Sequence, residues 1–309
     1  MQTYLTFDLG GTFIKYALMQ EDSTIVESGK VPSKTDCLES VLASLEEVAV
    51  KYPGRFAAVA ISMPGRINTK EGIAYTGGAY RFIHDLPFAK AVEERLGVPV
   101  KIANDGKCAA SAEAWNGALA DVNNGAVIVL GTATGGGIVL NHEVYMGSTG
   151  GAGELSNFIM DMYHFYDATG GLLDKAHLIW AGNTSATGLL LKYATKKGLD
   201  VWKLNGLQFF EAYDGGDPDA IEALEEFAKL TAVGIFSLQS VLDLERYAIG
   251  GGISARMEIT DKIREKVDEL FEKNPEAPFG KPEIVRCRYG NDANMIGALK
   301  FYLNDLSEE

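Results

Sequence analysis

The sequence predicts an α/β fold with two lobes. Short apolar segments with strand character alternate along the chain with segments in which apolar residues recur at helical spacing. Such alternation is typical of sheets covered by helices. The 309 residues exceed the usual size of a single hydrophobic core, which favours two lobes. Three glycine clusters each follow an apolar strand and place conformationally free backbone at strand ends.

The first glycine cluster follows the strand expected at residues 4–7. It reads Asp8-Leu9-Gly10-Gly11-Thr12, and a return strand is expected over Ile14 to Leu18. Glycine lets the chain adopt positive φ and approach phosphate oxygens, to which the Thr12 hydroxyl and nearby N–H groups donate. An ordinary tight hairpin explains this segment equally well when it is considered alone.

The same arrangement recurs further along the chain. A strand expected over 127–130 leads into the loop 131–137, and the strand resumes at 138–140. A third cluster, Gly250 to Gly252, follows a strand expected over 246–249 and precedes Ser254, the expected N-cap of the next helix. Three such turns, each more than a hundred residues from the next, favour a nucleotide site over unrelated turn chemistry.

The remaining elements follow from the same two periodicities. The expected elements are a helix over 38–48, a strand over 56–61 that ends at Ser62-Met63-Pro64-Gly65, a helix over 88–96, a strand over 98–102, and helices over 108–115, 224–238 and 259–270. A last helix, from about 292 to 303, is expected to return to the first lobe. We therefore predict one lobe from residues 1–118 plus 292–309 and the other from 119–291.

Composition narrows the function classes. The net charge of -14 and pI of about 4.8 disfavour nucleic acid as a partner. No stretch reaches the ~20 apolar residues of a membrane span, and the immediate first strand leads us to expect neither a signal peptide nor a DNA-binding helix-turn-helix. A cytoplasmic protein is expected. Cys37, Cys108 and Cys287 lack CxxC spacing, so we expect buried small apolar side chains rather than a disulfide or zinc site.

Five segments together resemble the ROK family of sugar kinases and sugar-responsive repressors. They are the loop 8–12, Asn104-Asp105, the loop 131–137, Gly153-Glu154 and Gly250 to Gly252, in the expected order along the whole chain. The resemblance implies an actin-like, hexokinase-type (ribonuclease H-like) ATPase fold whose lobes close over ATP and a sugar. The stretch 72–79 and the ending 291–298 are most similar to bacterial β-glucoside kinases, with N-acetylmannosamine kinases as near relatives.

The resemblance also implies roles for individual residues. Asp105 is the expected catalytic base, because a carboxylate that takes a proton from a sugar hydroxyl contributes about 10²- to 10⁴-fold. It lies where a strand gives way to a helix, the kind of crevice in which α/β proteins bind ligands. Capping that helix is the alternative role. Lys15 is left out of the site as a solvated lysine of the return strand.

The other implied residues surround this base. Asp8 is expected to orient Mg²⁺ through water. The expected nucleotide-binding residues are Asp8, Gly10, Gly11, Thr12, Gly131, Thr132, Gly251 and Gly252. The expected sugar-binding residues are Gly65, Gly78, Asn104, Asp105, Glu154 and Asn157, with the turn at Gly78 leaving room for an aglycone.

The chain departs from the family pattern at several positions. The usual Glu-x-Gly-His reads Glu154-Leu155-Ser156-Asn157, and the usual cysteine cluster is replaced by residues 163–167, so we predict that structural zinc is absent. A second sugar-binding glutamate has no counterpart. If Ala133 had a positive φ, it would carry a penalty of about 1 kcal/mol. Gly106-Lys107 weakens the expected helix start.

The sequence thus predicts an ATP-dependent sugar kinase that phosphorylates a sugar hydroxyl, expected to be O6. The favoured acceptor is a β-glucoside such as cellobiose, with glucose, fructose and N-acetylmannosamine as alternatives. A catalytically weak sugar-binding regulator without a DNA-binding domain is the alternative from another class. Asp105 and the glycine loops favour the enzyme. Family resemblance also implies a homodimer.

Overall fold

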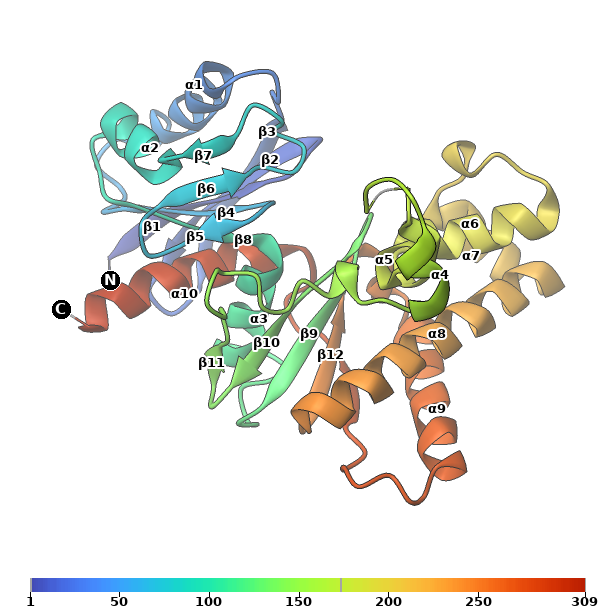
Figure 1. The fold of residues 1–309 in the computed structure, drawn as a ribbon. Coiled ribbons are helices and arrows are strands. Elements are labelled where there is room, and N and C mark those ends of the chain that lie inside the picture. The colour runs from blue at the N-terminus through green and yellow to red at the C-terminus, as the bar shows by residue number, and fades with distance from the viewer. Residues whose placement is uncertain (1, 173, 309) are drawn as a thin grey trace.

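The computed structural model describes residues 2–172 and 174–308 of the chain. Two five-stranded sheets share one strand arrangement (Figure 1). Each has an antiparallel three-stranded part and two further strands added in parallel. The first sheet has the order β3 (Ile25–Pro32), β2 (Phe13–Gln20), β1 (Thr3–Leu9), β4 (Val59–Met63), β8 (Val100–Asn104). The second has the order β11 (Glu143–Val144), β10 (Thr134–Leu140), β9 (Gly125–Leu130), β12 (Arg246–Gly250), β13 (Glu283–Arg286).

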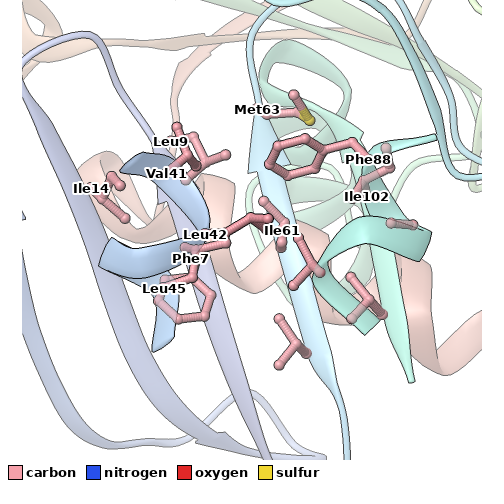
Figure 2. Packing of buried hydrophobic residues seen from close by; sticks show 14 of the residues in the cluster. Phe7, Leu9, Ile14, Val41, Leu42, Leu45, Ile61, Met63, Phe88 and Ile102 are labelled. Carbon is pink, nitrogen blue, oxygen red and sulfur yellow. The ribbon is translucent and has the colours of Figure 1, made fainter. Parts of the chain in front are cut away.

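The outer face of the first sheet is covered by α1 (Leu38–Ala49) and α2 (Phe88–Leu96). Figure 2 shows Phe7 of β1 and Ile61 of β4 packed against apolar side chains of these two helices. A smaller sheet of β5 (Ile67–Asn68), β6 (Ile73–Thr76) and β7 (His84–Leu86) lies beside them. Because successive side chains of a strand point to opposite faces, the even-numbered residues of β1 face the inside of the molecule. Asp8 lies on this inner face.

Two helices, α3 (Asp105–Asn116) and α10 (Ala293–Glu308), fill the space between the sheets (Figure 1). Alanines on α3 and apolar residues on α10 form one core with side chains from both sheets. The two helices approach very closely, because a Cβ atom added at Gly297 would overlap the carbonyl oxygen of Cys108. The last helix, which is predicted to return to the first lobe, packs on β1, β4 and β8.

The outer face of the second sheet is covered by the longer helices α8 (Pro218–Leu242) and α9 (Met257–Lys273). Four shorter helices complete this side of the molecule: α4 (Met162–Asp167), α5 (Trp180–Thr184), α6 (Ala186–Lys197) and α7 (Gly206–Asp214). None of the helices in the described ranges is both long and apolar enough to cross a membrane.

Most predicted elements are confirmed, and three local expectations are wrong. β4 and β8 begin two to three residues later than predicted. Ser254 is not the N-cap of α9, because it lies inside a 3₁₀ turn over Gly252–Ala255 and Arg256 takes the N-cap position. Cys37 is exposed rather than buried, because it occupies the extended N-cap position of α1. Cys108 and Cys287 are buried, as predicted. The lobe boundaries stay a prediction.

Candidate active site

Asp8 lies at the end of β1, and its carboxylate is held from three sides. Ser62 Oγ donates to Oδ1 over 3.2 Å from the end of β4, and Asn294 Nδ2 donates to the same oxygen over 3.0 Å from α10. Oδ2 faces Lys15 Nζ at 3.5 Å. Only 7% of the residue is exposed. The segments that meet at Asp8 are thus far apart in sequence, and α10 closes the inner side of the site.

Lys15, which is expected to be a solvated lysine outside the site, contacts the Asp8 carboxylate. In the β1–β2 hairpin Lys15 is the direct cross-strand partner of Asp8, and its ammonium also donates to the carbonyl oxygen of Asn291 over 3.4 Å. Directly opposed residues of an antiparallel pair present their side chains on the same face. Counting the register back from the turn would have identified this pair from sequence.

The first glycine turn is held rigidly by hydrogen bonds to Gly10. Its N–H donates to the carbonyl oxygen of Phe13 over 3.1 Å, and its own carbonyl accepts from Tyr80 Oη at 2.9 Å and Ser33 Oγ at 2.6 Å. Neither Gly10 nor Gly11 has a positive φ, so that expectation is wrong. Glycine fits at position 10 because a Cβ would lie 2.9 Å from the Phe13 oxygen. Gly11 and Thr12 are exposed and available to a ligand.

The second turn repeats this construction. The Gly131 N–H donates to the carbonyl oxygen of Ala133 over 3.0 Å, and its carbonyl accepts from the Ala186 N–H at the start of α6. Ala133 is not among the described residues with positive φ, so the penalty considered for alanine does not arise. Thr132 is exposed at the tip. Two tight strand-end turns therefore each present a free threonine side chain.

The third turn lies beside the second, because β12 pairs with β9. Gly251 has a φ of +92°, and a Cβ there would overlap the carbonyl oxygen of Leu130, the residue before Gly131. A residue with a side chain could not adopt this φ so close to the Leu130 backbone. Gly252 is exposed, with open space where its Cβ would stand. The two predicted nucleotide-binding turns of the second sheet are thus brought together.

At the junction of β8 and α3, the capping role falls to Asn104 and not to Asp105. Asn104 Oδ1 accepts from the Lys107 N–H over 3.2 Å, and its Nδ2 donates to the carbonyl oxygen of Gly65 over 2.9 Å. Gly65 has a φ of +103°, which favours glycine. The structure therefore joins Asn104 to Gly65 and leaves the Asp105 carboxylate free of the cap, bonded to the Gly106 N–H at 2.8 Å.

Asp105 is half-buried and has an unusual proton affinity. Burial, helped by the nearby negative charges of Asp8 and Glu154, raises its pKa to about 6, while the Gly106 N–H and the Lys107 ammonium oppose the increase. Such a carboxylate is ionised at neutral pH yet accepts a proton more readily than an ordinary aspartate. The charge of Asp8 acts on Asp105, which places the predicted base near the first glycine turn.

Glu154 follows a loop that packs closely against β10 and α3. Gly153 has a φ of +73°, and its Cβ would lie 3.0 Å from the Cα of Gly137; a Cβ at Gly106 would lie 2.6 Å from the carbonyl oxygen of Gly136. The glycines of β10 therefore serve backbone packing as well as turn formation. Gly106, which was expected to weaken the start of α3, fits because of this approach.

Lys107 reaches Glu154 and was missed by sequence reasoning. Its Nζ lies 2.8 Å from Glu154 Oε1, and its side chain is 1% exposed whereas that of Glu154 is 46% exposed. Nothing in the sequence around Lys107, in the first turn of a helix, indicated that its side chain would contact a residue of another loop.

Two other predicted sugar-binding residues lie apart from this ion pair. Asn157, at the end of the 3₁₀ turn Leu155–Asn157, is exposed, and Gly78, with a φ of +57°, packs against Pro64.

A cavity of about 1260 Å³ is lined by the small sheet, by residues 141–150 and by the later turns of α3 and α10. Its lining includes Arg66, which follows Gly65, and the loop 146–150, which precedes Glu154. Tyr75 and Trp115 contribute aromatic surface, and the guanidinium of Arg66 lies 4.3 Å from the centre of the Tyr75 ring. Asp8, Asp105 and Glu154 do not line the cavity. The cavity thus lies along the later turns of α3 and α10, away from the helix starts that carry Asp105 and Asn294.

Comparison with known proteins identifies the family. A model of the ROK family matches residues 4–304. The chain belongs to the ROK family. It is 29% identical over 301 residues to the beta-glucoside kinase of Klebsiella pneumoniae, with 97% of this chain and 95% of that protein aligned. It is 28% identical over 312 residues to the N-acetyl-D-glucosamine kinase of Vibrio atlanticus, with 96% and 98% aligned.

A solved ROK structure confirms the fold. The structure of a ROK family protein from Streptococcus pneumoniae in complex with sucrose matches all of this chain and all of its own, with a TM-score of 0.85 and 25% identity. The prediction of a two-lobed fold of the actin-like, hexokinase type is confirmed. The prediction of an ATP-dependent carbohydrate kinase is confirmed for this ROK chain, and both relatives are named sugar kinases.

Proposed function

We propose that this ROK protein is an ATP-dependent sugar kinase that transfers the γ-phosphoryl group to a sugar hydroxyl, with Asp105 as the catalytic base. The observation that carries the proposal is the half-buried Asp105 carboxylate, whose pKa is raised to about 6 between Asp8 and Glu154. A general base is most effective when its pKa lies near the working pH. The carboxylate stands at a strand end, where α/β proteins bind substrates.

The residues around the base suit phosphoryl transfer, which depends mainly on positioning and charge neutralisation. Asp105 accepts the proton of the acceptor hydroxyl as the bond to phosphorus forms. The Thr12 and Thr132 hydroxyls donate to the phosphates, together with N–H groups of the glycine turns other than those of Gly10 and Gly131, which bond within the turns. The Lys15 ammonium adds positive charge beside Asp8. Gly251 and Gly252 form the turn for the adenosine, with open space beside the Gly252 backbone.

The site also suits Mg²⁺. This ion is usually bound by one or two carboxylates together with substrate phosphates and waters. Among the described residues no group of three His, Cys, Asp or Glu side chains is arranged to hold a metal by itself, which fits an ion shared with the nucleotide. Asp8 would hold it through water. When bound, the ion neutralises negative charge on the phosphates.

A β-glucoside such as cellobiose is the proposed acceptor, with O6 as the reacting hydroxyl. The Klebsiella relative is named a beta-glucoside kinase, and the Streptococcus structure holds sucrose, a disaccharide. Glucose, fructose and N-acetylmannosamine remain alternatives, and the Vibrio relative adds N-acetylglucosamine.

An ADP-release screen tests this proposal. Purified protein with MgATP is assayed against cellobiose, gentiobiose, glucose, fructose, N-acetylmannosamine and N-acetylglucosamine, and NMR of the product identifies the phosphorylated hydroxyl. We expect saturable turnover with the highest kcat/KM for a β-glucoside and phosphorylation at O6. If no sugar is turned over while calorimetry detects sugar binding, the catalytically weak regulator is favoured and the kinase proposal is wrong.

Two further proposals accompany the kinase. The protein acts as a homodimer in the cytoplasm. Light scattering tests the oligomeric state, and fractionation of the native host tests the location.

The zinc-binding histidine and cysteines of the family are replaced in this chain, so we expect zinc analysis of the purified protein to give far less than one ion per chain. A stoichiometric zinc ion would contradict this.

A further inference from the structure

We propose that Lys107 is a positioning residue of the acceptor site, which fixes the Glu154 carboxylate and neutralises its charge beside Asp105. The inference rests on the proposed kinase function. Lys107 has no role in the phosphoryl transfer described above.

The position of Lys107 is unfavourable for a cation in two respects. Lys107 is the third residue of α3, where the partial positive charge of the helix N-terminus disfavours a lysine. Its side chain is also 1% exposed, and removing an ammonium from water is costly unless a counter-charge compensates. A lysine held here therefore depends on the carboxylates of the site.

A comparison with the second buried lysine among the described residues supports this reading. Lys266 lies on the outer helix α9 and contacts three carboxylates, those of Glu225, Glu265 and Glu269. Lys107 contacts one, Glu154, at 2.8 Å. Its charge also interacts with that of Asp105, two residues earlier in the same helix turn. Lys107 thus contacts a carboxylate of the candidate site, whereas Lys266 belongs to a network of surface carboxylates.

The Lys107–Glu154 ion pair leaves Asp105 as the carboxylate of the site that has no lysine partner among the described residues. Three carboxylates meet here: Asp8 from β1, Asp105 from α3 and Glu154 from the loop before the 3₁₀ turn. Lys15 of β2 pairs with Asp8, and Lys107 pairs with Glu154. Within the described chain, Asp105 forms no ion pair and accepts only the Gly106 N–H. The buried Cys108 thiol, whose pKa is raised well above its ordinary value by burial, adds no charge.

This arrangement has two consequences for the acceptor. Lys107 donates to one oxygen of Glu154, Oε1, which restricts the orientation of this half-exposed carboxylate. It also offsets the negative charge of Glu154, which otherwise makes Asp105 harder to ionise. Loss of Lys107 is therefore expected to weaken acceptor binding and to impair the base at the same time.

Four variants test the proposal: Lys107→Met, Glu154→Gln, the double variant, and Lys229→Met on the exposed surface of α8 as control. The first readout is the pH dependence of kcat/KM by ADP release. We expect K107M to raise the midpoint of the acid limb by about one pH unit, because Glu154 is left unneutralised. E154Q is expected to lower it, and the double variant to return it close to the wild-type value. The acceptor KM rises several-fold in all three, and the control changes neither.

The second readout is the titration of the Asp105 carboxylate followed by carbon NMR without substrates, which does not depend on turnover. Opposite shifts in the two single variants support the proposal even if the wild type phosphorylates no sugar, in which case only the kinase function is wrong. Unchanged midpoints, or shifts in the same direction, overturn the role of Lys107 even if the wild type is an active kinase. Calorimetric MgATP binding equal to that of the wild type shows that each variant is folded.

Discussion

At the scale of single residues, the site depends on how its carboxylates are paired. Asp8 and Glu154 each lie next to a lysine, whereas Asp105 accepts one backbone N–H and is half-buried. Burial and the neighbouring negative charges raise the pKa of Asp105 to about 6. The same side chain is therefore ionised at neutral pH and a better proton acceptor than an exposed aspartate.

The pH dependence of turnover follows from this value. Asp105 must be ionised to accept a proton, so kcat/KM should be nearly constant above pH 7 and fall about tenfold per pH unit well below a midpoint of about 6. Steady-state ADP release between pH 4.5 and about 8.5, in a buffer of constant ionic strength, measures this profile. An acid limb centred near the ordinary aspartate value of about 4 would show that the environment of Asp105 does not tune it.

Asp105 is also expected to lower the stability of the protein. Its folded pKa is raised, so the folded state holds the proton more tightly than the unfolded state, and ionisation costs stability as the pH rises from about 4 to above 6. Asp105→Asn should therefore raise the free energy of unfolding at pH 8 by about 1–3 kcal/mol and change it little at pH 4. Denaturant unfolding at both values, with surface Asp268→Asn as control, measures this. Equal stability of variant and wild type at pH 8 would contradict it.

The sequence predicted some of these residues and missed others for a physical reason. Asp8, Asn104, Asp105 and Glu154 stand in short local motifs at strand ends. Lys15 was recoverable from hairpin register alone. The Asn294 contact with Asp8 and the Lys107 contact with Glu154 depend on how α10 and α3 pack, and no local pattern encodes that packing.

At the scale of elements, the site is positioned by α3 and α10 between the sheets. Both helices are buried on several sides, and their backbones meet at Gly297 and Cys108. The start of α3 carries Asp105, and the start of α10 carries Asn294. The crossing of the two helices therefore sets the position of the base relative to Asp8.

Gly297→Ala tests this crossing. The added Cβ overlaps the Cys108 carbonyl oxygen, which is backbone and cannot move without shifting α3. We expect a loss of about 1–3 kcal/mol in the free energy of unfolding, together with a lower kcat. Gly206→Ala, at the start of α7, is the control and should be close to neutral, because its Cβ would make only an ordinary van der Waals contact, 3.9 Å from Ile253 Cγ2. A G297A protein as stable and active as the wild type would show that the crossing tolerates separation.

The sequence predicted the longer elements well because their periodicities are clear. The segment from about 155 to 214 was not predicted, because its helices α4 and α5 span only six and five residues and give no stable period. The sequence also did not reveal that some glycines are required by close backbone packing. Gly136 and Gly137 were assigned to a phosphate loop, whereas contacts with α3 and the 153 loop account for them.

At the scale of the whole molecule, two sheets of equal topology face each other across α3 and α10 (Figure 1). Each contributes a tight glycine turn after its central antiparallel strand, at Gly10 and at Gly131. The order of motifs along the chain predicted this architecture and the family, whereas the substrate depends on the geometry of the pocket, which no motif specifies.

The most direct test of the central claim compares Asp105→Asn with the wild type. Sugar-dependent ADP release and calorimetric sugar binding are measured with the best acceptor of the screen, and D268N serves as the surface control. We predict that D105N binds the sugar with an affinity within a few-fold of the wild type but loses about 10²-fold or more in kcat. Near-normal turnover by D105N would contradict the claim that this carboxylate is the base.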